Sequence, residues 1–117
     1  TSIMGQRAKL EIAVDLMNFT YLADSSYVSK GTLVNAYSSI HHDVFVDEFC
    51  ELAPKVSILG GSIIGKYTFI GSGAIILPNL SIGSNVIVGA GSVVTKNLPD
   101  NIIAYGNPAR LIRENIR

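Results

Sequence analysis

The chain has 117 residues, and its nine Lys and Arg residues balance nine Asp and Glu residues to a formal net charge of zero. This length suits one domain with a substantial hydrophobic core, and the neutral charge gives no bulk attraction to nucleic acid or acidic membranes, so we expect neither as a partner. No signal peptide and no apolar run of about 18 residues is visible, which predicts a cytoplasmic protein.

The first predicted element is a helix over residues 3–17. Its apolar residues recur at a helical spacing and would share one face, with most charged residues elsewhere: Ile3, Leu10, Val14 and Met17. Leu10 and Leu16 also fit the six-residue repeat that follows, but the residues between them lack its turn chemistry. We therefore predict a helix, with residues 1–18 as the first of three segments. Because the chain starts in the middle of this pattern, we expect a truncated N-terminus.

From residue 22 onward the sequence repeats every six residues. One position in six is always Leu, Ile or Val, without an insertion: Leu22, Val28, Val34, Ile40, Val46, Leu52, Ile58, Ile64, Ile70, Ile76, Ile82, Val88 and Val94. Four residues after each comes a second series, mostly small: Ser26, Thr32, Ser38, Val44, Cys50, Val56, Ser62, Thr68, Ala74, Leu80, Val86 and Ser92. Neither a helical period nor a strand period explains this pattern, which is a hexapeptide repeat.

Strand geometry predicts that this repeat forms a three-sided coil. Residues two apart in an extended chain point to the same side, so the small residue and the next aliphatic residue both point inward. Turn-tolerant residues, such as Gly65 and Gly71, often follow the aliphatic position, where we expect the bend. Three strands and three bends close a turn of about 18 residues, and residues 22–93 then form about four coils, roughly 19 Å of stacked prism. Cys50 falls in the small inward series, which favours a packed core residue over a nucleophile.

After Val94 the repeat stops, and residues 99–117 form the last expected segment, following the coil at 19–98. Residues 102–105 read as extended chain. Gly106, Asn107 and Pro108 then indicate the start of a short helix, because Asn suits the N-cap and Pro the first helical position. This helix would cap the open end of the prism.

Two tail motifs and two internal motifs resemble a known family. The tail is Gly-Ala-Gly-Ser-Val-Val-Thr-Lys-Asn-Leu-Pro from Gly89, then Ala-Tyr-Gly-Asn-Pro-Ala-Arg from Ala104. It resembles the acyltransferases that are left-handed β-helices and use acetyl-CoA. Ile40-His41-His42-Asp43 and Phe49-Cys50-Glu51-Leu52-Ala53-Pro54 more narrowly resemble the sugar acetyltransferases related to sialic-acid O-acetyltransferases and bacillosamine-pathway N-acetyltransferases.

The resemblance implies an all-β fold, a left-handed parallel β-helix. The repeat and the end segments described above add about four coils, a short N-terminal helix and a C-terminal capping helix. Parallel crossovers are otherwise almost always right-handed, so the repeat alone would not give this hand. In the family a nucleotide-sugar-binding domain precedes the β-helix. Residues 1–18 would then be the last helix of that domain.

The resemblance also implies a catalytic group of His42, Asp43 and Asn35. Acyl transfer from a thioester needs a base for the attacking hydroxyl or amine, and imidazole titrates near working pH. Asp43 matches the family's carboxylate, which orients the ring or strengthens it as a base. Asn35 matches a position near the same site. His41 is the weaker candidate for the base, and the alternative is that all these side chains merely decorate a solvated corner.

Glu51 departs from the family pattern. Relatives usually carry a second histidine there, near the thioester, and an ionised carboxylate cannot donate a hydrogen bond to a developing oxyanion. Backbone amides could then stabilise the oxyanion, the acceptor could differ, or activity could be weakened. An ordinary solvent-facing role for Glu51 remains open.

The acetyl-CoA site is expected along stacked corners. Residues 18 apart lie one above another, which aligns Pro54, Ser72 and Ala90, and the family binds the pantetheine arm along such a column. Lys96 and Arg110 are candidates for the CoA phosphates. Tight bends explain the neighbouring glycines nearly as well, and solubilising charges explain the basic residues. We expect no metal site.

His42 and the column through Ser72 would lie on different sides of the prism. One subunit cannot easily bring both to one point, whereas a threefold assembly places a side of one subunit against a different side of the next. The family is trimeric, and we expect a homotrimer.

The sequence therefore favours an acetyl-CoA-dependent acetyltransferase acting by direct transfer on a sugar or nucleotide-sugar. Another hexapeptide acyltransferase, such as a serine O-acetyltransferase, and a non-catalytic β-helix scaffold are alternatives. A γ-type carbonic anhydrase needs three histidines on zinc, but only His41 and His42 exist. An ice-binding coil would show ranks of Thr on one face, and the Thr residues form none.

Overall fold

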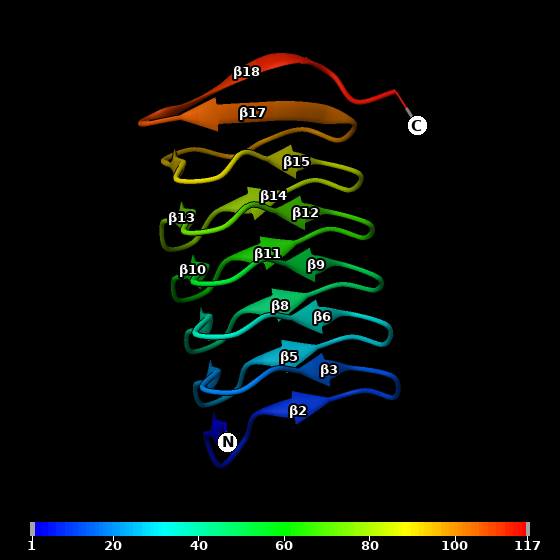
Figure 1. Ribbon diagram of the computed structural model, residues 1–117, viewed down its shortest axis with the longest axis vertical. Helices are drawn as coiled ribbons and strands as arrows, with labels where there is room; N and C mark the ends of the chain where they lie inside the picture. Colours follow the sequence, from blue (N-terminus) through cyan, green and yellow to red (C-terminus); the bar gives the residue numbers. More distant parts are fainter. Residues whose placement is uncertain (1, 117) are drawn as a thin grey trace.

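The computed structural model describes residues 2–116 and shows a three-sided β-solenoid, with the N-terminal coil at one end and the C-terminal strands at the other (Figure 1). Thr1, the first residue of the first expected segment, and Arg117, the last residue of the last one, lie outside the described residues. Each of the first five coils contributes one two-residue strand to each of three sheets, which we call faces A, B and C. The predicted parallel β-helix is confirmed.

The strands are distributed as follows. Face A holds β1 (Ile3–Met4), β4 (Tyr21–Leu22), β7 (Ser39–Ile40), β10 (Ser57–Ile58), β13 (Ile75–Ile76) and β16 (Val93–Val94). Face B holds β2 (Lys9–Leu10), β5 (Tyr27–Val28), β8 (Phe45–Val46), β11 (Ile63–Ile64) and β14 (Ser81–Ile82). Face C holds β3 (Asp15–Leu16), β6 (Leu33–Val34), β9 (Glu51–Leu52), β12 (Phe69–Ile70), β15 (Ile87–Val88), β17 (Ile102–Gly106) and β18 (Ala109–Glu114).

The core follows the six-residue repeat. All thirteen aliphatic residues from Leu22 to Val94 are at most 1% exposed. Each fully buried Leu, Ile or Val contributes about 1.5–3 kcal/mol of transfer free energy. Register reinforces this packing, because Ile58 pairs with Ile40 below it and with Ile76 above it. The backbone ladder and the apolar column therefore share one period.

The bends lie two residues later than expected. Fourteen successive corners, from Ala13 to Gly91, end on a residue with φ between 54° and 76°, and most of these residues are not glycine. Such left-handed backbone costs a non-glycine residue roughly 1–2 kcal/mol, which the stacked coils offset. Gly71, which we assigned to a bend, instead allows close approach: a Cβ there would come within 2.6 Å of the Ala90 nitrogen in the next coil.

The predicted helix over residues 3–17 is wrong. These residues form the first coil, with β1, β2 and β3 in parallel register with the strands above them. Met4, Leu10 and Leu16 continue the aliphatic series, and Ala8 and Val14 continue the small series. The helical spacing of these apolar residues is thus coincidental, and the residues follow the six-residue repeat. Strands β1 to β15 make five complete coils, and β16 begins a sixth, more than the four expected.

The predicted C-terminal helix is also wrong. β17 pairs parallel with β15 and antiparallel with β18, so residues 102–114 form a hairpin at the end of the solenoid (Figure 1). Asn107 and Pro108, the expected helix start, form the hairpin turn. Ile102, Ala104 and Ala109 join the core, so the hairpin covers the end that the helix was expected to cover. The described residues include no helix that could cross a membrane.

Buried hydroxyl groups link successive coils at the corners. Thr68 Oγ1 donates to the Gly83 carbonyl at 2.8 Å and accepts from the Val86 amide at 3.2 Å. Ser38 and Ser62 make the same two bonds in their own coils. Each hydroxyl therefore satisfies a carbonyl and an amide that would otherwise be buried without partners.

Cys50 occupies the same inward position. Its Sγ donates to the Gly65 carbonyl at 3.0 Å, and its side chain belongs to the core. Burial raises the pKa of the Cys50 thiol to about 12. The predicted core role is confirmed, because a thiol that stays protonated is a poor nucleophile.

The corner hydrogen bonds generate the first prediction. Thr68→Val keeps the shape of the side chain, and valine already occupies the equivalent positions 44, 56 and 86. The change leaves the Val86 amide and the Gly83 carbonyl without this partner, so the free energy of unfolding should fall by about 1–3 kcal/mol. Urea denaturation followed by circular dichroism measures it. The exposed Thr95→Val is the control, expected within about 0.5 kcal/mol of wild type. Equal stability of Thr68→Val and wild type would contradict the role of the hydroxyl.

Candidate active site

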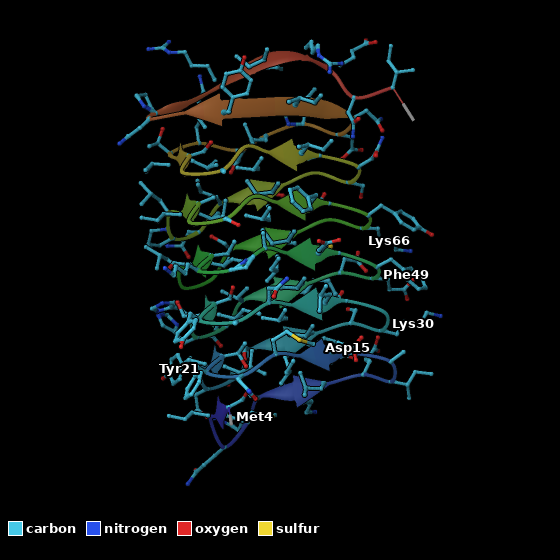
Figure 2. The ribbon with its side chains drawn as sticks, viewed as in Figure 1. Met4, Asp15, Tyr21, Lys30, Phe49 and Lys66 are labelled. Carbon is cyan, nitrogen blue, oxygen red and sulfur yellow. The ribbon has the colours of Figure 1, made fainter. Side chains whose placement is uncertain are left out.

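Three columns of corners define where polar side chains can gather. The A–B corner joins faces A and B at residues 24–25, 42–43, 60–61, 78–79 and 96–97. The C–A corner carries residues 36–37, 54–55, 72–73 and 90–91. The B–C corner carries Lys30, Phe49 and Lys66, which lie one above another along one edge (Figure 2). Lys30 and Lys66 flank Glu48 there at 4.0 and 3.8 Å, a surface ion-pair ladder.

His42 and Asp43 form a pair at the A–B corner. His42 Nδ1 lies 3.0 Å from Asp43 Oδ2, and the two side chains are 69% and 66% exposed. A neutral imidazole that donates its Nδ1 proton to this carboxylate keeps its lone pair on Nε2. The predicted orienting contact between these two residues is therefore present. It leaves a basic nitrogen free to accept a proton from a bound nucleophile.

Gly60 provides the space for the imidazole. It stands one coil above His42, and a Cβ added to it would collide with Nε2 and Cε1 of the ring. The main chain fixes the same stacking, because the Gly61 amide donates to the His42 carbonyl at 2.9 Å. Gly60 has no left-handed φ. Its lack of a side chain therefore serves the contact with His42 and not the bend.

His41 is directed elsewhere. Its Nε2 lies 3.3 Å from Ser39 Oγ, and its ring meets Tyr21 edge-on at 6.3 Å between centroids. It is half-buried on face A, whereas His42 stands at the exposed corner. This arrangement supports the choice of His42 over His41.

Asn35 and Glu51 do not join His42 within one chain. Asn35 precedes the C–A corner, and its Oδ1 accepts from the adjacent Ala36 amide at 3.1 Å. Glu51 is exposed in β9 on face C, between Leu33 and Phe69 of the neighbouring coils. Face A separates the C–A corner, near Asn35, from the A–B corner, where His42 stands. The two corners are up to six extended residues or about 20 Å apart.

The residues expected to bind CoA also divide between corners. Ser72 and Ala90 stack at the C–A corner, and Arg110 is the second residue of β18, close to the hairpin turn, where the Gly106 amide donates to Ser92 Oγ beyond the same corner. Lys96 lies on the A–B corner instead. Within residues 2–116 the amides of Ser72 and Ala90 have no hydrogen-bond acceptor, while the following residues donate to the coil below. Because both residues are exposed, this column can offer hydrogen-bond donors to a ligand.

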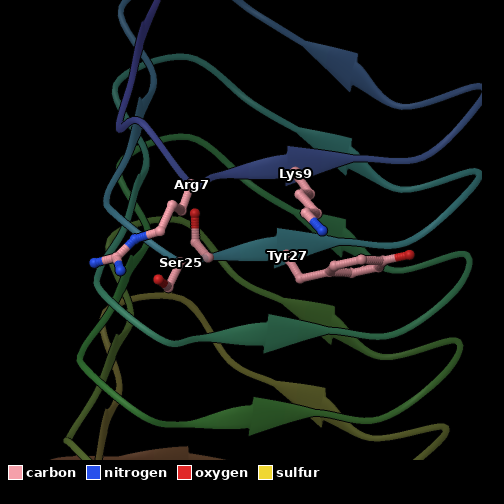
Figure 3. A pocket seen from close by; sticks show the side chains of 5 residues that line it. Arg7, Lys9, Ser25 and Tyr27 are labelled. Carbon is pink, nitrogen blue, oxygen red and sulfur yellow. The ribbon is translucent and has the colours of Figure 1, made fainter.

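Two shallow hollows lie near the first coils. One, of about 390 Å³, is lined by Arg7, Lys9, Ser25, Ser26 and Tyr27 (Figure 3). Arg7 is paired there with Asp24 at 3.1 Å, and hydrogen bonds from the Arg7 backbone amide and guanidinium lower the pKa of that carboxyl. The other is lined by Leu10, Glu11, Ile12, Lys30 and Glu48. Neither hollow contains a predicted site residue.

Sequence reasoning missed Gly60 as part of the site. The signal was available, since Gly60 follows His42 by one coil of 18 residues. No group of three or more His, Cys, Asp or Glu residues that could hold a metal occurs between residues 2 and 116.

Comparisons with known proteins agree with this fold. Residues 61–96 match the family described as "Bacterial transferase hexapeptide (six repeats)". Protein CapG of Staphylococcus aureus is 45% identical over 82 residues, which cover 70% of this chain and 48% of that protein. GDP-perosamine N-acetyltransferase of Escherichia coli O157:H7 is 37% identical over 97 residues, 79% of this chain and 44% of that enzyme.

Among solved structures, the acetyltransferase domain of PglB from Neisseria gonorrhoeae FA1090, in complex with acetyl coenzyme A, is similar with a TM-score of 0.80. It is 26% identical, and the match covers 95% of this chain and 57% of that one. The chain spans about half the length of the curated relatives it matches. The expected resemblance to hexapeptide-repeat sugar acetyltransferases is confirmed.

The contact between Gly60 and His42 generates the second prediction. Gly60→Ala should displace the imidazole without straining the backbone, because alanine already stands at the first corner position in Ala36 and Ala90. We expect shifted ring resonances for His42 and a weaker Nδ1 hydrogen bond in NMR spectra of the imidazole nitrogens. Ala36→Gly, at another corner, should leave these signals in place. An unchanged His42 spectrum in Gly60→Ala would show that the ring does not rest on Gly60.

Proposed function

Because the chain is a hexapeptide-repeat solenoid similar to a sugar N-acetyltransferase, we propose that it is the β-helix part of an acetyl-CoA-dependent acetyltransferase. The acceptor is an amine or hydroxyl of a sugar or nucleotide-sugar. The observation that carries this proposal is the His42–Asp43 pair, with Nδ1 bound to the carboxylate and Nε2 at an exposed corner.

His42 acts as general base in this proposal. Nε2 takes the proton of the acceptor as it attacks the thioester carbonyl, and Asp43 holds the ring through Nδ1. A positioned base of this kind contributes about 10²–10⁴-fold to the rate. Direct transfer is supported by Cys50, the single cysteine, which is buried with a raised pKa and cannot serve as an acyl carrier.

Acetyl-CoA binds as a substrate along the C–A corner. The amides of Ser72 and Ala90, which have no hydrogen-bond acceptor within residues 2–116, can donate to the amide carbonyls of a pantetheine arm. Arg110, on the same side of the solenoid, can pair with a phosphate group. Lys96 and Glu51 are weaker candidates for the CoA site, because Lys96 lies on the A–B corner and Glu51 lies on face C.

A homotrimer would bring the two corners together. His42 and the Ser72–Ala90 column stand at opposite edges of face A, so one chain cannot place both beside a thioester. A threefold assembly sets the A–B corner of one subunit against the C–A corner of the next. Asn35 would then approach His42 of a neighbouring subunit. The same proposal includes a cytoplasmic location, where acetyl-CoA and reduced Cys50 coexist.

The third prediction tests the base. His42→Gln should lower acetyl transfer by about 100-fold or more, while acetyl-CoA binding measured by calorimetry stays within about threefold. The assay follows CoA thiol release with GDP-perosamine and other nucleotide-linked amino sugars as candidate acceptors, and mass spectrometry identifies the product. His41→Gln is the matched control and should keep most of the activity, because His41 lies on face A against Tyr21.

Two outcomes would overturn parts of this proposal. Equal turnover by His42→Gln and wild type would remove His42 as the base. Binding of acetyl-CoA without transfer to any acceptor would instead favour a non-catalytic scaffold.

A further inference from the structure

One of the two hollows lies on the same edge of the solenoid as the candidate base. It has a volume of about 390 Å³, and we call it the corner hollow; its lining is Arg7, Lys9, Ser25, Ser26 and Tyr27 (Figure 3). Ser25 occupies the A–B corner position one coil below Asp43, and Arg7 occupies it one coil lower still. The Asp43 amide fixes this stacking by donating to the Asp24 carbonyl at 3.2 Å. The corner hollow therefore lies one to two coils, or about 5–10 Å along the axis, below His42.

Two cationic side chains flank the corner hollow. Asp24 Oδ2 lies 3.1 Å from Arg7 Nη2, so this carboxylate offsets one of the two positive charges. Lys9 makes no ion pair with any residue from 2 to 116. The next carboxylate along the corner, Asp43, is hydrogen-bonded to His42. The corner hollow thus keeps one positive charge that no neighbouring carboxylate pairs with.

The polar groups of the corner hollow are mainly hydrogen-bond donors. Within the described residues Arg7 gives only Nη2 to Asp24, which leaves Nη1 and Nε for a ligand. Lys9 carries three N–H donors, and the Ser25 hydroxyl has no partner between residues 2 and 116. Such donors favour an anion with several oxygen atoms. Figure 3 shows Arg7 and Lys9 extending to different sides of the hollow, an arrangement that suits two linked phosphates better than one.

We propose that the corner hollow binds a diphosphate group, and that the acceptor of the acetyl transfer supplies it. The second part rests on the function proposed above. A sugar linked to a diphosphate in this hollow would extend along the A–B corner toward His42 Nε2, over a distance comparable with the length of a pyranose ring. CoA carries the same chemical group. Its column through Ser72 and Ala90, however, lies on another corner, and Arg110, the candidate for its phosphates, is at the opposite end of the solenoid.

The fourth prediction uses inorganic pyrophosphate and GDP as probes of the chain in NMR titrations. Both should shift the backbone amide signals of Arg7, Lys9 and Ser25, and binding should weaken as salt is raised, because the contacts are between charges. Lys9→Gln should weaken the binding of both probes about tenfold. Lys66→Gln removes one lysine from the B–C corner instead and is the matched control, expected to bind both probes as wild type does.

Two further measurements identify the source of the diphosphate. If the acceptor supplies it, CoA should shift the amides of Ser72 and Ala90 and leave that of Lys9 in place. Lys9→Gln should then raise KM for GDP-perosamine without changing KM for acetyl-CoA or kcat. A shift at Lys9 that CoA causes and pyrophosphate reverses would instead assign the corner hollow to CoA and overturn the assignment to the acceptor.

The remaining outcomes separate this inference from the proposed function. Absence of probe binding at the corner hollow, or equal binding by Lys9→Gln and wild type, would overturn the diphosphate site and leave the acetyltransferase proposal standing. Pyrophosphate binding that depends on Lys9, in a chain that transfers acetyl to no acceptor, would count against the proposed function and support the diphosphate site alone.

Discussion

The structure depends on one constraint, which is the parallel register of successive coils at an interval of 18 residues. Each strand pairs with the strand one coil away, as Leu22 does with Ile40 and Ile40 with Ile58. Because three six-residue repeats complete one coil, the same interval stacks aliphatic residues inside and corner residues outside. A functional side chain therefore acquires neighbours 18 residues away in either direction, and Gly60 above His42 is one such neighbour.

Much of the fold could be predicted from this period, and the two wrong predictions, both of a helix, have a common cause. The aliphatic positions from Leu22 to Val94 gave the correct core, since burial of branched side chains dominates the stability of the coil. At the two ends of the chain, local helix signals were given more weight than the six-residue period. Leu10 fits both the predicted helix face and the coil, and only its parallel pairing with Val28 in the coil above decides between them. Asn107 and Pro108 suit a helix start equally well as a hairpin turn.

Within the candidate site, a contact between adjacent residues was easier to predict than the arrangement of residues that lie far apart in the sequence. Adjacent residues such as His42 and Asp43 were placed correctly because their contact is local. Asn35, Glu51 and Lys96 were grouped by resemblance, but the chain places them on different corners and faces. The repeat gives columns within a subunit, whereas it says nothing of how subunits meet.

The claim that corners of different subunits build the acetyl-transfer site is tested most directly by a crystal structure of the chain with bound CoA. We expect three chains around a threefold axis, with CoA along Ser72 and Ala90 of one chain and its sulfur facing His42 Nε2 of a neighbour. A chain without such neighbours, with the imidazole of His42 facing bulk solvent or CoA bound away from the C–A corner, would contradict it.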